Sequence, residues 1–192
     1  MGNLVRTLKF LAVLILVGAI VLWFAARRGD RGYIHAEITI DRTAPVVFRW
    51  ITSDELLRRW ISDVTKLERS GITPASTDFR LEENVVNQPV AFDVKTVRTI
   101  PNQEIDLLVK PPDGSGSSYI SDVNLKLFPD GDYTRLAFSS QTNFYSLYDQ
   151  IFEPILTYTI RRKLRDDLER LKVMVEAEGT TPSEVRGRAK GQ

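Results

Sequence analysis

Six strand-like segments follow one another through the middle of this chain, and a single long amphipathic helix comes after them. In two of them, 89–99 and 117–128, apolar and polar side chains alternate, which is the period of a strand with one buried and one solvated face. A further alternating segment, 33–41, precedes the six, which cover 62–69, 77–83, 89–99, 103–109, 117–128 and 133–142. Turn residues separate them, most clearly Pro129-Asp130-Gly131-Asp132. We therefore expect a curved, seven-stranded antiparallel sheet with one apolar face.

Two short helices are expected between the first strand and the other six. Thr43-Ala44-Pro45 suits the start of one helix, because proline is tolerated in a first turn. Ser53 is placed to cap a second helix over 54–60, which has acidic residues in its first turn. Neither helix is long enough to cover a seven-stranded sheet.

The closing helix is the element that must cover the apolar face of the sheet, which makes the fold class α+β. Its apolar stripe consists of Leu164, Leu168, Leu171 and Val175. The charged run 161–170, with Lys163 and Asp167 in it, is expected on the solvated side. Pro154 is expected in the first turn of this helix, since proline breaks a helix interior. That placement leaves 143–152 as a separate short helix or lid.

An uninterrupted apolar run, FLAVLILVGAIVLWFAA, occupies residues 10–26 between two basic residues. As a helix it would be about 25 Å long, near the lower limit for crossing a hydrocarbon core of about 30 Å. The alternatives are a cleaved signal peptide and a buried helix. Cleavage needs a small side chain where Trp23 or Phe24 stands. We therefore expect an uncleaved, single-pass membrane anchor within residues 1–32.

The orientation of this anchor follows from the basic residues beside it. Arg6 and Lys9 precede the run, whereas Arg27, Arg28 and Arg31 follow it. The side that follows the run therefore has one more basic residue than the side that precedes it, and the positive-inside rule favours a cytoplasmic domain. The charge of the free amino terminus nearly cancels this difference.

Charge and composition limit the kinds of partner and cofactor. Residues 33–178 contain 18 basic and 23 acidic residues, whereas the basic flanks 1–32 and 179–192 carry net charges of +4 and +2. An acidic domain does not suit nucleic acid, and basic flanks suit an anionic membrane. The absence of Cys and the single His exclude disulfides, iron–sulfur clusters and His-rich metal centres. We predict no cofactor, no metal, a monomeric domain over 33–178 and a disordered tail over 179–192.

The candidate ligand-binding residues are aromatic or amide side chains on expected inner faces or on the lid. Packing in the core is the alternative role for each of them, and we assign Trp50 to it. No catalytic residue is predicted, because no paired carboxylates and no inward histidine are found on an apolar face. His35, Asp106, Asp122 and Asn124 all fall on polar faces. The candidates are Trp60, Phe79, Phe92, Tyr119, Gln141, Tyr145, Tyr148 and Phe152.

Two local patterns and the order of elements resemble the START-like helix-grip superfamily, also called SRPBCC, and within it the polyketide cyclase/dehydrase and lipid-transport branch. The resemblance covers about 33–178. It implies a deep cavity for apolar or amphipathic molecules between the sheet and the closing helix. The matching residues are Pro45-x-Val47-Phe48-x-Trp50, Asp54-Glu55-Leu56-Leu57-x-x-Trp60, and a closing helix with Leu164-x-x-Asp167-Leu168-x-x-Leu171-Lys172 and Glu176.

The sequence thus predicts a membrane-anchored binding or carrier module for a hydrophobic small molecule or lipid. Its expected partners are the lipid bilayer and that molecule. Two alternatives remain open: a cyclase/dehydratase-type enzyme acting on a lipophilic substrate, and an interaction domain with a filled core.

Overall fold

The computed structural model describes residues 6, 11–18, 32–69, 78–85, 88–116 and 118–178. Strand β1 (Tyr33–Ile40) is followed by two short helices, α2 (Ala44–Thr52) and α3 (Asp54–Trp60). Six strands come next: β2 (Val64–Arg69), β3 (Phe79–Val85), β4 (Gln88–Ile100), β5 (Glu104–Lys110), β6 (Tyr119–Asp130) and β7 (Tyr133–Phe144). The described domain ends in α4 (Leu147–Ala177), a helix of 31 residues.

The seven strands form one antiparallel sheet in the order β1-β7-β6-β5-β4-β3-β2. This arrangement confirms the expected sheet, and every strand begins and ends within two residues of its predicted range. The Gly131 turn joins β6 to β7 with a positive φ of 60°, as its hairpin sequence indicates. Pairing of β1 with β7 brings the first strand beside the last one.

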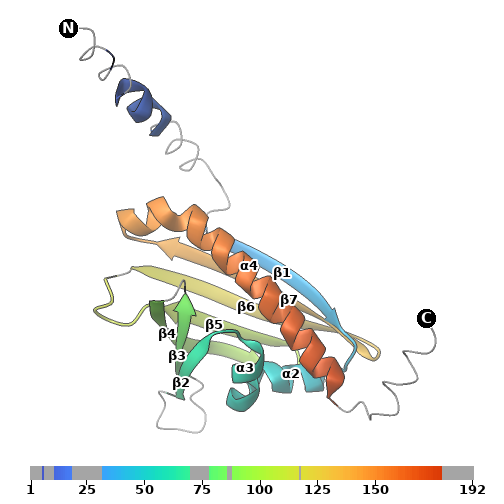
Figure 1. Ribbon diagram of the computed structural model, residues 1–192. Helices are drawn as coiled ribbons and strands as arrows, with labels where there is room; N and C mark the ends of the chain where they lie inside the picture. The colour runs from blue at the N-terminus through green and yellow to red at the C-terminus, as the bar shows by residue number, and fades with distance from the viewer. Residues whose placement is uncertain are drawn as a thin grey trace.

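Helix α4 lies across one face of the sheet, over β1 and β7, and we call this the inner face (Figure 1). Alternate side chains of the strands point to it and build the core with α2, α3 and α4. The predicted stripe of α4 is confirmed, since Leu168, Leu171 and Val175 are buried in this core. The largest fully buried side chains are Ile40, Val47, Thr134, Leu136, Leu171 and Val175.

Hydrogen bonds from backbone N–H groups fix α4 to the rest of the fold. A carboxylate that accepts such a bond makes a stronger bond than a neutral acceptor does. The contacts are spread from the first turn of α4 to its last, so both ends of the helix are held. The pairs are Asp149 with Ser118 at 3.1 Å, Glu153 with Gly32 at 3.0 Å, Asp167 with Ser62 at 2.9 Å and Glu176 with Asp41 at 2.8 Å.

The carboxyl end of α4 meets α2 through Trp50, which is 4% exposed and packs in the core as expected. Its indole Nε1 donates a hydrogen bond to Glu178, and Arg49 Nη2 donates another at 2.6 Å. The hydrogen bond from Trp50 is the main cause that lowers the pKa of the Glu178 carboxyl, and the hydrogen bond from Arg49 lowers it further.

The prediction that Pro154 begins the closing helix is wrong. Helix α4 begins at Leu147, and the Ser146 Oγ caps it by accepting from the backbone N–H of Asp149 at 3.0 Å. The expected separate helix or lid over 143–152 is therefore absent, because β7 and the first turns of α4 occupy that stretch. A proline inside a helix costs about 3 kcal/mol. The carboxylate contacts of Asp149 and Glu153 stabilise the helix on the amino-terminal side of Pro154.

The chain enters β1 through a turn that only glycine fits. Gly32 has a φ of +65°, and a Cβ built on it would lie 2.3 Å from the backbone oxygen of Thr142. The Gly32 carbonyl accepts from Thr142 N at 3.0 Å, which joins it to β7. The segment that precedes the domain is therefore attached to it at a fixed point.

Of the predicted anchor at 10–26, the structure describes residues 11–18, which are helical. Across the ranges described, no helix is both long and apolar enough to cross a membrane. The rest of the predicted anchor lies outside those ranges, and so does the predicted tail over 179–192.

Candidate functional site

The inner face of strands β3 to β5 is apolar and only partly covered. Helix α4 packs mainly against β1, β7, α2 and α3, and it reaches β3 through the ion pair of Lys163 with Glu83. Four of their inner-face side chains, Phe79, Phe92, Leu107 and Val109, are half-buried although they point to the same side as the core. We call these four the open inner face. An apolar surface that is shaped by a sheet and incompletely covered is suited to an apolar ligand.

Polar side chains lie at one end of this surface. Ser121 pairs in register with Val109, and its hydroxyl is 2.7 Å from that of Thr142 on β7. Tyr119, two residues before Ser121 on the same face of β6, is half-buried beside Phe144, with ring centroids 6.2 Å apart. Burial, and after it the charge of Asp149, raises the pKa of the Tyr119 phenol. Tyr119 therefore keeps its proton at neutral pH and can donate a hydrogen bond.

A cluster of charged side chains lies between β3 and α4, and we call Glu83, Lys163 and Asp167 the interior charge cluster. Lys163 Nζ is 3.3 Å from Glu83 Oε2 and 2.8 Å from Asp167 Oδ2. The two carboxylate side chains are 11% and 6% exposed, and the lysine side chain is 23% exposed. Glu83 follows Phe79 and Leu81 at alternate positions of β3, which places it on the inner face.

This cluster corrects two sequence expectations. Lys163 and Asp167 were expected on the solvated side of the closing helix, but they flank its apolar stripe and point inward. The expectation that no paired carboxylates lie on an apolar face is also wrong, because Glu83 and Asp167 share one ammonium group. Their positions are possible because Asp167 also accepts from the backbone of Ser62, which satisfies a second lone pair.

Glu83 and Asp167 share the single ammonium group of Lys163, and the Glu83 carboxyl binds a proton more tightly than usual. Burial is the main cause that raises the pKa of Glu83, and Lys163 opposes it, while the charges of Asp167 and Asp63 add to it. A carboxyl with a raised pKa in the interior of a fold is suited to exchange a proton with a bound molecule.

The eight sequence-predicted binding residues do not come together at one place. Phe79, Phe92 and Tyr119 lie on the inner face, as expected. Trp60 is 7% exposed and packs in the core, where its Nε1 donates to the Trp50 carbonyl at 3.1 Å. Gln141 alternates with inward Ser140 and lies on the opposite face of the sheet.

The other three predicted residues lie before or within the first turns of α4. Tyr145 is 59% exposed and Phe152 is 39% exposed. Tyr148 belongs to α4, but its side chain lies outside what the structure describes. Binding by these residues stays a prediction.

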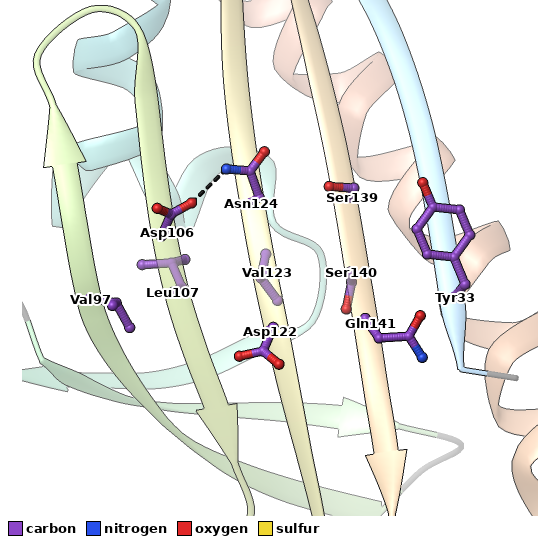
Figure 2. A pocket seen from close by; sticks show the side chains of 10 residues that line it. All are labelled: Tyr33, Val97, Asp106, Leu107, Asp122, Val123, Asn124, Ser139, Ser140 and Gln141. Carbon is purple, nitrogen blue, oxygen red and sulfur yellow. Dashed lines mark hydrogen bonds between the residues drawn. The ribbon is translucent and has the colours of Figure 1, made fainter. Parts of the chain in front are cut away.

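The opposite, outer face of the sheet has a hollow of about 400 Å³. Figure 2 shows its lining on the side of the strands turned away from α4, with polar side chains on β5, β6 and β7 and the ring of Tyr33 on β1. Asp106, Asp122 and Asn124 are among these side chains, which confirms their predicted polar face. Both polar and apolar groups line this hollow, and it lies on the side of the sheet opposite to the core.

Asp106 at this hollow and Glu104, two residues before it on β5, already have partners. Arg98 Nε donates to Asp106 at 2.7 Å and its Nη2 donates to Glu104 at 2.7 Å, while Asn124 bridges both carboxylates. The bonds from Asn124 are the main cause that lowers the pKa of both acids. The network stabilises the solvated face of the sheet.

Comparison with known proteins identifies the fold. No family model and no curated protein matches the sequence. Three solved structures are similar over most of their length. The first is the ZhuI aromatase/cyclase from Streptomyces sp. R1128 (14% identity, 78% of this chain, 98% of that chain, TM-score 0.66). The second is a START superfamily protein from Mycobacterium smegmatis (14%, 75%, 97%, 0.62), and the third is a conserved protein from Geobacillus kaustophilus (14%, 74%, 94%, 0.63).

These structural similarities confirm the resemblance to the START-like helix-grip superfamily that the sequence indicated. The chain has the START-like helix-grip fold: a seven-stranded antiparallel sheet whose inner face is crossed by one long carboxyl-terminal helix.

Proposed function

We propose that this protein is a membrane-anchored binding or carrier module for a hydrophobic small molecule or lipid, held between α4 and the open inner face. The observation that carries the proposal is the partial exposure of Phe79, Phe92, Leu107 and Val109 on the concave side of a START-like fold. Covering apolar area with an apolar ligand is favourable by about 25 cal/mol per Å².

The arrangement favours an amphipathic ligand. Leu107 and Val109 offer apolar contacts, and the hydroxyls of Ser121, Thr142 and Tyr119 follow along the same face. A polar group of the ligand would bond to these hydroxyls while its apolar part lies on the leucine and the valine. A few polar groups in an apolar site fix the orientation of a ligand.

Membrane anchoring is the second part of the proposal, and it is supported by the apolar run 10–26. In the described part of that run, Leu11, Val13, Leu14, Ile15, Leu16 and Val17 are each more than half exposed. A helix that is apolar and exposed on all sides is stable in lipid rather than in water. We place the domain on the cytoplasmic side by the positive-inside rule. The anchor would hold the binding site beside a reservoir of apolar molecules.

An enzyme of the cyclase/dehydratase type is the second candidate, and the interior charge cluster favours it. Glu83 is a buried carboxyl whose pKa is raised by burial, and Lys163 lies beside it. Such a pair can move a proton on a bound substrate. This candidate is tested by comparing the molecules bound to the wild type and to Glu83→Gln, since an enzyme would accumulate substrate in the variant whereas a carrier would hold the same molecule in both.

The binding proposal predicts that filling the open inner face weakens ligand affinity. We expect the wild type to bind a fluorescent fatty-acid analogue with micromolar affinity, about −8 kcal/mol. Leu107→Trp should weaken it by about tenfold or more, since excess volume in a packed site costs about 1–3 kcal/mol. Leu108→Trp is the matched control, because Leu108 is the next residue of β5, is also half-buried and points to the outer face. Titration by fluorescence, with thermal unfolding of each variant, gives the comparison.

Equal affinity in both variants would mean that the ligand lies elsewhere. An absence of saturable binding to any apolar probe would favour the interaction domain with a filled core.

A further inference from the structure

In the first half of α4 two acidic side chains are buried, whereas several large apolar side chains are exposed. Asp149 and Glu153 are 7% and 5% exposed and point to the sheet. On the side of the helix away from these two acids, four large apolar residues are each more than a third exposed, and we call them the outer apolar face of α4. They are Ile151, Phe152, Ile155 and Tyr158.

This arrangement is the reverse of an ordinary surface helix, which buries its apolar stripe. The second half of the same helix follows the ordinary rule, since Leu168, Leu171 and Val175 are buried there. The exposed residues recur at spacings of three and four, so they share one side of the helix. A continuous apolar patch on the surface of a soluble domain marks a contact with another apolar surface.

Hydrogen bonds fix the first half of α4 in this orientation. Asp149 Oδ2 accepts from Ser118 N at 3.1 Å and from the Ser146 hydroxyl at 2.6 Å. Glu153 Oε1 accepts from Gly32 N at 3.0 Å and from the Thr157 hydroxyl at 2.9 Å. Rotating the helix to bury its apolar side would break the two bonds to Ser118 and Gly32 and leave their backbone N–H groups without these partners. The outer apolar face therefore stays outward.

Residues 27–31, which we call the tether, join the apolar run to Gly32. Their short length indicates what lies against the outer apolar face. Glu153 holds Gly32, and the apolar run 10–26 ends only six residues before Gly32. Six residues span at most about 20 Å when fully extended. If the run crosses the bilayer, as proposed above, the first half of α4 cannot lie farther than this from the end of the membrane span.

The charges beside this face are those that anionic headgroups attract. Arg161 and Arg162 are exposed and follow the outer apolar face after about one turn of α4. Arg161 Nη2 also donates to the Tyr33 carbonyl at 3.2 Å, which holds it beside the start of β1. Arg27, Arg28 and Arg31 lie in the tether itself. Basic residues next to apolar and aromatic ones are typical of a helix that lies in a membrane interface.

We propose that the outer apolar face of α4 lies in the interface of the membrane that anchors the chain, with an anionic bilayer as its partner. This inference rests on the proposed anchoring. It places the start of α4, which borders Tyr119 through Ser118 and Asp149, next to the lipid from which a ligand would come.

A fluorescence experiment on the full chain tests this proposal. The chain has no cysteine, so Ile155→Cys and Val173→Cys each provide one site for an environment-sensitive nitrobenzoxadiazole label. Ile155 and Val173 are equally exposed, 63% and 66%, and lie on the two halves of the same helix. Each labelled chain is reconstituted into vesicles of phosphatidylcholine and phosphatidylglycerol, with and without nitroxide-labelled lipid. Thermal unfolding checks that both variants are folded.

We expect the label at position 155 to shift to the blue in vesicles and to lose most of its emission to the nitroxide lipid, while the label at 173 changes little. Flotation of the vesicles separates the two proposals. A chain that floats with its label at 155 unquenched overturns the docking of α4 and leaves the anchor intact. A chain that does not float overturns the anchor and the docking with it. The label at 155 could also be shielded from water equally in detergent and in vesicles, in a chain that elutes as a dimer. That result overturns the docking on the membrane and means that a second copy of the chain covers the outer apolar face.

Discussion

Replacing Lys163 by methionine should lower the free energy of unfolding at neutral pH by about 3–5 kcal/mol, because it leaves two carboxylates in the interior without a counter-charge. Methionine keeps most of the apolar stem, so the loss reports the charge rather than the packing. Urea denaturation followed by circular dichroism measures it. Lys172→Met is the matched control, since Lys172 also pairs with an acid four residues on in α4, at 4.0 Å, and its side chain is 36% exposed. The control should change stability by less than about 0.5 kcal/mol.

The pH dependence of this loss gives a second readout. The pKa of Glu83 is raised in the folded protein by burial, so the folded state holds this proton more tightly than the unfolded chain does. Stability from this group is therefore gained as the pH falls through its folded pKa toward its unfolded pKa. The defect of Lys163→Met should shrink over that range, and Glu83→Gln should be at least as stable as the wild type at neutral pH. A defect below about 1 kcal/mol, or one that does not change with pH, would mean that the three groups do not form a cluster in solution.

Leu168→Ala should cost about 2–5 kcal/mol of unfolding free energy. Leu168 is 3% exposed and lies in the core shared by α4, the two short helices and the sheet. Truncation removes apolar contacts and leaves a cavity that the surrounding strands cannot fill. Val173→Ala is the control on the same helix, because Val173 is 66% exposed.

The same urea titration measures both alanine variants. Val173→Ala is expected to change stability by less than about 0.5 kcal/mol. Similar losses in the two variants would show that α4 does not pack as described.

The sheet could be predicted from the sequence because its signal is local. A strand with one dry face repeats every two residues, and turn residues stand between strands, so each of the seven could be located separately. The antiparallel order followed from the hairpin turns. The apolar stripe of α4 is likewise a pattern within one element, and Leu168, Leu171 and Val175 are buried as it indicates.

The start of α4 was misplaced because one local rule was given too much weight. Proline is unfavourable inside a helix, which led to Pro154 being placed in the first turn. Ser146, followed three residues later by Asp149, is the signature of a helix start, and this signal was present in the sequence. Tertiary bonds from the helix to Ser118 and Gly32 outweigh the cost of the proline, and no local pattern shows those bonds.

The interior charge cluster could not be predicted from composition, because Lys163 and Asp167 stand in a run of charged residues that is typical of a solvated face. Their partner, Glu83, is distant in the sequence. Its position was nevertheless indicated, since Glu83 continues the inner-face alternation of Phe79 and Leu81. Gln141 lies on the outer face, which its place in the alternation of β7, next to inward Ser140, indicates, and a role for it in binding stays a prediction. How much of the inner face α4 covers depends on where the helix crosses the sheet, and no sequence pattern gives that.

Native mass spectrometry of the full chain, released from lipid nanodiscs, tests whether the open inner face holds a ligand. We expect a main species at the mass of the chain plus one apolar small molecule or lipid. It also predicts that Leu107→Trp loses this molecule and that Leu108→Trp, on the outer face of the same strand, keeps it. A wild-type chain found only at its bare mass, after exposure to a total lipid extract of its host, would contradict the proposal that the open inner face binds an apolar ligand.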